Sequence, residues 1–131
     1  MASRQRPISP HIQVYRWQVQ MVTSILHRAT GIVLVAGSLL FVWGLWALAA
    51  GPEQWSDFSG FARSIPGFVV LFGWSWAFAY HLANGIRHVL QDAGWGFQIP
   101  DFIRNSWTTI IVSLVITALL WFAAMQQWGG A

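Results

Sequence analysis

Two histidines within one apolar segment are the residues of this chain best suited to chemistry. His81 and His88 are seven positions apart, so a helix places both on one face, about 10 Å apart along its axis. A neutral imidazole offers a nitrogen lone pair to a metal, and Gly85, on nearly the same face, leaves room for a flat macrocycle. The spacing therefore admits His81 as a haem ligand. The alternative is a histidine hydrogen-bonded across helices, and His88 is expected nearer the headgroups, where it would snorkel or contact a propionate.

A second polar group lies at the start of the preceding apolar segment. Ser24 and Arg28 are i,i+4 neighbours on one helix face, with His27 beside them. A hydroxyl and a guanidinium at the edge of the hydrocarbon could bind the carbonyl of a quinone, and the guanidinium could also pair with a haem propionate. The alternative is that Arg28 only marks the inner end of a membrane helix.

The composition requires a membrane environment for these residues. The chain has 131 residues, of which 56% are hydrophobic and 8% charged, whereas a soluble domain carries about a quarter charged residues. It has no cysteine, which excludes disulfides, thiolate metal sites and an iron–sulfur cluster held by this chain alone. The few arginines form no cluster on a soluble face, so no nucleic-acid partner is expected.

Three charge-free stretches, residues 29–50, 65–86 and 105–131, are each long enough to cross a bilayer. We expect helices over residues 19–50, 65–90 and 105–128, after a polar segment at residues 1–18. Residues 51–64 and 91–104 are expected as linkers. The sequence thus predicts an all-α membrane protein with three transmembrane helices, forming one membrane-anchor domain over residues 1–131.

The arginines predict how this bundle is oriented. Six arginines fall on one side of the predicted bundle and only Arg63 on the other, which places the N-terminus in the cytoplasm or matrix by the positive-inside rule. The six are Arg4, Arg6, Arg16, Arg28, Arg87 and Arg104. The N-terminal segment lacks the pattern of a signal peptide or transit peptide. We expect a multi-pass protein of the bacterial inner membrane, with the mitochondrial inner membrane as the less favoured location.

Three short segments together strongly resemble the cytochrome b subunit family of succinate dehydrogenase, the larger of the two small membrane anchors of respiratory complex II. They are Arg6–His11 (RPISPH), Ser24–Gly31 (SILHRATG) and His81–His88 (HLANGIRH). The resemblance runs from residue 4 to about residue 100, and the family also has three spans. One departure is Trp95, which stands where the family often has a basic residue.

The resemblance implies roles for individual residues. His81 corresponds to the axial ligand of haem b, and His88 does not ligate the iron in that pattern. His27 and Arg28 correspond to residues near the haem propionates. Ser24 and Arg28 correspond to residues that line the ubiquinone site. No catalytic residue is assigned, because the chain would act only as a subunit of the enzyme.

The same resemblance implies cofactors and partners. One haem b would be shared with a second small membrane-anchor subunit, which would supply the other axial histidine, and ubiquinone would be the substrate. A flavoprotein subunit and an iron–sulfur subunit would complete the complex, because this chain has neither a dinucleotide-binding fingerprint nor a cysteine. The chain would then help to pass electrons from succinate to quinone, linking the tricarboxylic acid cycle to the respiratory chain.

Three other functions remain compatible with the residues. The chain could be the haem b anchor of a fumarate reductase, since the sequence does not fix the direction of the reaction. It could be a small transporter or channel subunit in which a buried histidine relays protons. It could also be a purely structural helix bundle, which would leave the costly polar residues at one membrane depth without a purpose.

Overall fold

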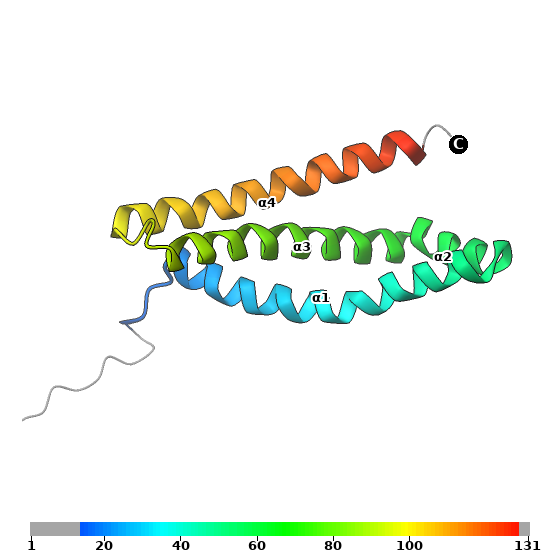
Figure 1. Ribbon diagram of the computed structural model, residues 1–131, viewed down its shortest axis with the longest axis horizontal. Coiled ribbons are helices and arrows are strands. Elements are labelled where there is room, and N and C mark those ends of the chain that lie inside the picture. Colours follow the sequence, from blue (N-terminus) through cyan, green and yellow to red (C-terminus); the bar gives the residue numbers. More distant parts are fainter. Residues whose placement is uncertain (1–13, 129–131) are drawn as a thin grey trace, which may run out of the picture.

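The structure is a computed structural model that describes residues 14–128, and it consists of three long helices and one short helix (Figure 1). The long helices are α1 (Val19–Ala50), α3 (Ile65–Asp92) and α4 (Ile99–Trp128), and α2 (Pro52–Arg63) joins α1 to α3. Helix α3 lies between α1 and α4 and runs antiparallel to both. Each long helix is long and apolar enough to cross a membrane. The prediction of an all-α membrane protein with three spanning helices is confirmed.

The segment between the first two spans, expected as a linker, instead contains the helix α2. Gly51, with φ of 129°, ends α1, and Pro52 lies in the first turn of α2, where its missing N–H and fixed φ suit a helix start. Glu53 in the first turn and Arg63 in the last turn complement the helix dipole. Aromatic packing holds α2 against α1, with the rings of Phe58 and Trp43 5.0 Å apart.

A tight corner joins α2 to α3. The Ser64 side chain caps α3 by accepting a hydrogen bond from the Gly67 backbone N–H at 3.2 Å, which satisfies one of the free donors of the first turn. Gly67 is buried, and a Cβ atom there would collide with the backbone carbonyl of Phe61. Only glycine lets the two helices approach this closely.

The connection between α3 and α4 is shorter than expected. Helix α3 continues to Asp92 and α4 already begins at Ile99, so only residues 93–98 lie between them, where the sequence predicts a linker over 91–104. Gly94 and Gly96 adopt φ angles of 90° and 76°, which glycine tolerates without strain. Asp101, in the first turn of α4, pairs with Arg104 at 2.8 Å.

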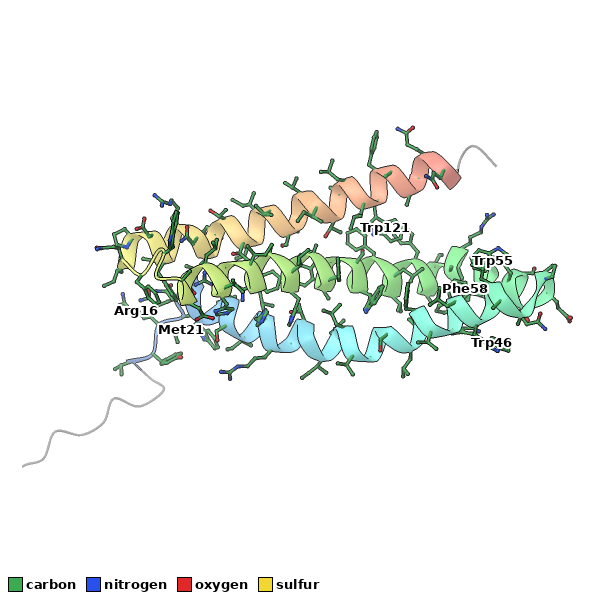
Figure 2. The ribbon with its side chains drawn as sticks, viewed as in Figure 1. Arg16, Met21, Trp46, Trp55, Phe58 and Trp121 are labelled. Atoms are coloured by element: carbon green, nitrogen blue, oxygen red, sulfur yellow. The ribbon has the colours of Figure 1, made fainter. Side chains whose placement is uncertain are left out.

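The helices pack through small and polar residues, as membrane helices commonly do. The buried residues of α1 are Thr23, Thr30, Gly37, Gly44 and Ala47. Indole N–H groups link the helices further along. Trp121, which points from α4 toward α3 (Figure 2), donates to the Ser75 hydroxyl at 2.8 Å. Trp74 donates to the Leu34 carbonyl at 3.4 Å. Large apolar side chains face outward, including Ile32 and Leu39, each 73% exposed. Lipid or neighbouring helices would cover them.

Candidate functional site

His81 is held against α1 through one nitrogen of its ring. Its Nδ1 atom lies 3.2 Å from the carbonyl oxygen of His27 and 3.3 Å from the hydroxyl oxygen of Thr30. A carbonyl oxygen only accepts hydrogen bonds, so this contact places the proton of a neutral ring on Nδ1. Nε2 then carries the lone pair, which is the arrangement of metal-binding histidines whose other ring nitrogen donates a hydrogen bond to a carbonyl group.

Thr30 is suited to accept from His81. Its hydroxyl lies 2.7 Å from the Leu26 carbonyl and 3.0 Å from the His27 carbonyl, to which it donates. Because the single hydroxyl proton is used within α1, the Thr30 oxygen is left to accept from the His81 Nδ1–H. The orientation of a side chain on α3 is therefore set by one turn of α1.

His27 lies directly beside His81. Their ring centroids are 3.9 Å apart and the ring planes are inclined by 13°. Imidazole lone pairs lie in the plane of the ring, so two stacked rings do not point at a common ion between them. In this arrangement the two imidazoles would not both bind one metal ion. The His27 Nδ1 atom is buried and has no hydrogen-bond partner within the described residues.

The surroundings of His81 contain room for a flat group. A Cβ atom at Gly31 would come within 3.2 Å of the His81 Cε1 atom, so the absence of a side chain at Gly31 lets the imidazole lie against α1. A Cβ atom at Gly85 would have no heavy atom within 4 Å, which leaves open space on nearly the same face of α3 as His81. Within residues 14–128 no three His, Cys, Asp or Glu side chains gather to hold a metal ion.

Ser24 and Arg28 are both exposed on the outside of α1. No hydrogen bond within the described part of the chain joins either of them to His81 or His27. The structure therefore brings together His27 and His81 and leaves Ser24 and Arg28 facing outward, available to a ligand or to another subunit. His88 is exposed too, with its ring 5.3 Å from that of His27.

A buried polar network adjoins this site on the face of α1 that packs against α3. The Tyr80 hydroxyl donates to the Thr23 carbonyl at 2.9 Å, and Arg87 donates to Thr23 Oγ1 at 3.4 Å and to Asn84 Oδ1 at 3.0 Å. Asn84 and Arg87 belong to the HLANGIRH segment that the sequence analysis singled out, but the contributions of α1 and Tyr80 were not predicted. The sequence contains a signal for the packed face of α1. Small or polar residues recur there at every seventh position and are buried in the structure: Thr23, Thr30, Gly37 and Gly44.

Two of the sequence features that suggested a function lie outside the described residues. These are the Arg6–His11 segment and the N-terminal arginines Arg4 and Arg6. The other two segments, Ser24–Gly31 and His81–His88, pack against each other through Thr30, His27 and His81.

Comparison with known proteins gives a consistent result. The family model for the succinate dehydrogenase/fumarate reductase transmembrane subunit matches residues 2–120. The succinate dehydrogenase cytochrome b556 subunit of Paracoccus denitrificans is 42% identical over 114 residues, which cover 87% of this chain and 88% of that protein. The corresponding subunit of Rickettsia typhi is 36% identical over 116 residues, covering 88% and 90% of the two chains. The mitochondrial cytochrome b560 subunit of Sus scrofa is 40% identical over 119 residues, covering 87% of this chain and 66% of that one.

These matches span nearly the whole chain, including both segments that meet at His81. The chain therefore belongs to the family of succinate dehydrogenase/fumarate reductase transmembrane subunits.

Proposed function

We propose that this chain is a membrane-anchor cytochrome b subunit of succinate dehydrogenase, that it binds one haem b through His81, and that it forms part of a ubiquinone-reduction site. The observation that carries the proposal is the contact between the His81 Nδ1 atom and the His27 carbonyl at 3.2 Å. This contact leaves Nε2 as the free ligand atom, in a chain whose relatives are named cytochrome b subunits.

The residues around His81 fit a haem. Hydrogen bonding from Nδ1 raises the basicity of Nε2 and fixes the orientation of the ring. Open space beside Gly85 accommodates the edge of a macrocycle, and the unpartnered Nδ1 of His27 is available to a propionate oxygen. When bound, haem b supplies a one-electron carrier. The stacked rings of His27 and His81 do not point at a common atom, so we propose that a second small anchor subunit would supply the other histidine that holds the haem.

Ser24 and Arg28 form this chain's share of the quinone site. The Ser24 hydroxyl would donate a hydrogen bond to one quinone carbonyl, and the Arg28 guanidinium would stabilise the negative charge that develops on the oxygen during reduction. Ubiquinone takes up two electrons and two protons to become ubiquinol. Both side chains are exposed on α1, so a partner subunit would close the site from the other side and exclude water from it.

The electrons must reach the site from other subunits. The chain has no cysteine, so it holds no iron–sulfur cluster, and we propose a flavoprotein subunit and an iron–sulfur subunit as its soluble partners. Relatives in Paracoccus and Rickettsia support a location in the bacterial inner membrane. The arginine-rich end of the bundle, with Arg16, Arg87 and Arg104, would face the cytoplasm.

Purification through an affinity tag on this chain tests the assignment. The complex is expected to contain flavin, iron, acid-labile sulfide and a b-type haem, and to reduce ubiquinone with succinate. A tagged chain that purifies from its native membrane with no flavin, iron or haem would overturn it. A complex that reduces fumarate with menaquinol much faster than it oxidises succinate would assign the chain to a fumarate reductase, which the same family includes.

A further inference from the structure

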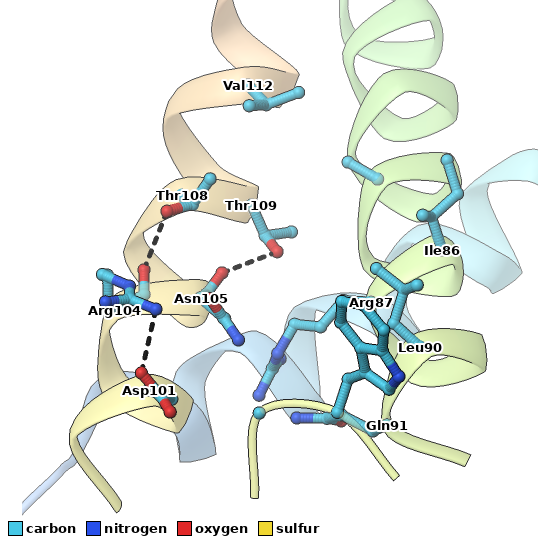
Figure 3. A pocket seen from close by; sticks show the side chains of 13 residues that line it. Ile86, Arg87, Leu90, Gln91, Asp101, Arg104, Asn105, Thr108, Thr109 and Val112 are labelled. Atoms are coloured by element: carbon cyan, nitrogen blue, oxygen red, sulfur yellow. Dashed lines mark hydrogen bonds and ion pairs between the residues drawn. The ribbon is translucent and has the colours of Figure 1, made fainter. Parts of the chain in front are cut away.

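A pocket lies on the side of α3 opposite to His81. It has a volume of about 510 Å³ and lies between the C-terminal part of α3 and the start of α4 (Figure 3), within the size range of small-molecule sites. Its lining includes Leu90, which is about 180° around the helix from His81 at 100° per residue. The residues proposed to hold the haem and the quinone, which are His81, His27, Ser24 and Arg28, do not line this pocket, so the pocket is distinct from both proposed sites.

Arg87 brings a buried positive charge to this pocket. Its side chain is 7% exposed and points from α3 into the space beside α4 (Figure 3). The guanidinium donates from Nη1 to Asn84 and Thr23, and its carbon lies 4.6 Å from the centre of the Phe102 ring. Its Nε atom is buried without a hydrogen-bond partner in the described part of the chain.

Within residues 14–128, no carboxylate forms an ion pair with Arg87. The single ion pair within those residues joins Arg104 to Asp101 at the rim of the same pocket. A buried charge without a counter-charge is costly, above all near the hydrocarbon of a membrane. An anion bound in the pocket would offset this cost.

Gln91 provides a second unpaired donor one helical turn further along. It is 6% exposed, lines the pocket, and its Nε2 atom is buried with no hydrogen-bond partner among the described residues. Residues at i and i+4 lie on one helix face, so Arg87 and Gln91 present their free donors on the same side of α3. Together they match a group with several acceptor oxygens and a negative charge.

The pocket also has an apolar end. Ala83, Ile86 and Val112 line it on the side away from the connection at residues 93–98, whereas Trp95 and Arg104 line the side near that connection. Trp95 is 73% exposed, and tryptophan favours the level of the lipid headgroups. A ligand that fills the whole pocket would be anionic at one end and apolar at the other.

We propose that this pocket binds an anionic glycerophospholipid. Its phosphodiester oxygens would accept hydrogen bonds from Arg87 Nε and Gln91 Nε2, and its glycerol and first acyl carbons would lie against Ala83 and Ile86. A quinone is neutral and would leave the Arg87 charge uncompensated, and inorganic phosphate would leave the apolar end empty. The lipid would thus join α3 to α4 at the arginine-rich end of the bundle.

Lipid titration of the delipidated complex, followed by native mass spectrometry, tests the proposal. The probes are phosphatidylglycerol, diacylglycerol with the same acyl chains, and inorganic phosphate. Phosphatidylglycerol is expected to bind at least tenfold more tightly than diacylglycerol, and 10 mM inorganic phosphate is expected not to displace it. Equal binding of the two lipids would overturn the recognition of phosphate. Displacement by inorganic phosphate would instead identify free phosphate as the ligand and overturn the lipid.

Three variants locate the site. Arg87→Gln is expected to weaken phosphatidylglycerol binding about tenfold, equivalent to about 1.4 kcal/mol, and Gln91→Leu about threefold. Arg63→Gln is the matched control, because Arg63 is an exposed arginine at the other end of the bundle. Since Arg87 also bonds Thr23 and Asn84, its replacement could impair assembly. Gln91→Leu removes a donor that has no hydrogen-bond partner among residues 14–128, so it serves as the deciding variant in that case. Unchanged phosphatidylglycerol binding in Gln91→Leu would overturn the site.

Discussion

The imidazole ring of His27 lies stacked on that of His81, with the ring centroids 3.9 Å apart and the planes inclined by 13°. The backbone carbonyl of the same His27 contacts the His81 Nδ1 atom. One residue of α1 therefore orients the histidine of α3 twice, through its ring and through its backbone. The binding of any group by His81 will therefore depend on how closely α1 and α3 pack at this point.

Thr30 is expected to act as a positioning residue for His81. Thr30→Val removes the hydroxyl that lies 3.3 Å from His81 Nδ1, whereas Thr30→Ser keeps it. Loss of a hydrogen-bond partner that orients a metal-binding histidine typically weakens metal binding roughly 10–100-fold. We expect the valine variant to have less haem per flavin and altered electron paramagnetic resonance g values of the haem, and the serine variant to resemble the wild type. Wild-type haem content and g values in the valine variant would contradict this role.

Gly31 is expected to tolerate no side chain without a change at His81. Gly31→Ala would place a Cβ atom 3.2 Å from His81 Cε1, so the imidazole would have to shift. Gly73→Ala is the control, because a Cβ atom there meets no heavy atom within 4 Å and the change in helix propensity is the same. We expect the haem g values to change in the first variant and not in the second. If the haem g values of both variants equal those of the wild type, the orientation of His81 does not depend on this close approach.

Ser24 and Arg28 are expected to affect quinone reduction and not succinate oxidation. Removal of a donor to a developing oxyanion lowers kcat by roughly 100-fold or more, and we expect an effect of this size for Arg28→Leu and about tenfold for Ser24→Ala. Reduction of an artificial dye by succinate should remain at the wild-type rate. The control is Ser38→Ala, since Ser38 is exposed on α1 and bonds only within its own helix. Equal loss of quinone and dye reduction in an assembled complex would refute the assignment.

The absence of cysteine makes the orientation of the bundle directly measurable. Phe97→Cys lies in the connection between α3 and α4, and Glu53→Cys lies at the start of α2, at the opposite end; both positions are exposed. With Arg16, Arg87 and Arg104 at the first end, a membrane-impermeant maleimide should label Phe97→Cys only in inside-out vesicles. Glu53→Cys should be labelled only in right-side-out vesicles. The reverse pattern would invert the proposed orientation.

The sequence predicted the spanning helices because long apolar runs have few other solutions in a membrane. It did not predict α2, in which Trp55 and Phe58 alternate with Glu53 and Asp57 and no apolar run marks a helix. The start of α4 at Ile99 was not predicted for a similar reason. Asp101 and Arg104 are charged, so the sequence places them in a linker. In the structure they form an ion pair across one turn of α4.

For the site, the resemblance related both His27 and His81 to one haem, but it did not predict that their rings stack on each other. It did not predict the role of Thr30, because threonine in a membrane helix usually bonds only its own backbone. Thr30 does this as well, and only the packing of α1 against α3 brings its oxygen to His81. The pocket beside Arg87 was not predicted either, because it forms only where α4 packs against α3. The pattern of apolar residues does not determine which residues of the two helices lie opposite each other.

The most direct test of the proposed function is the dithionite-reduced minus oxidised optical spectrum of the purified complex, compared between the wild type, His81→Leu and His88→Leu. If His81 ligates haem b, the b-type bands of the wild type will be lost or shifted in His81→Leu and retained in His88→Leu. Unchanged bands in His81→Leu, or their loss only in His88→Leu, would contradict ligation by His81.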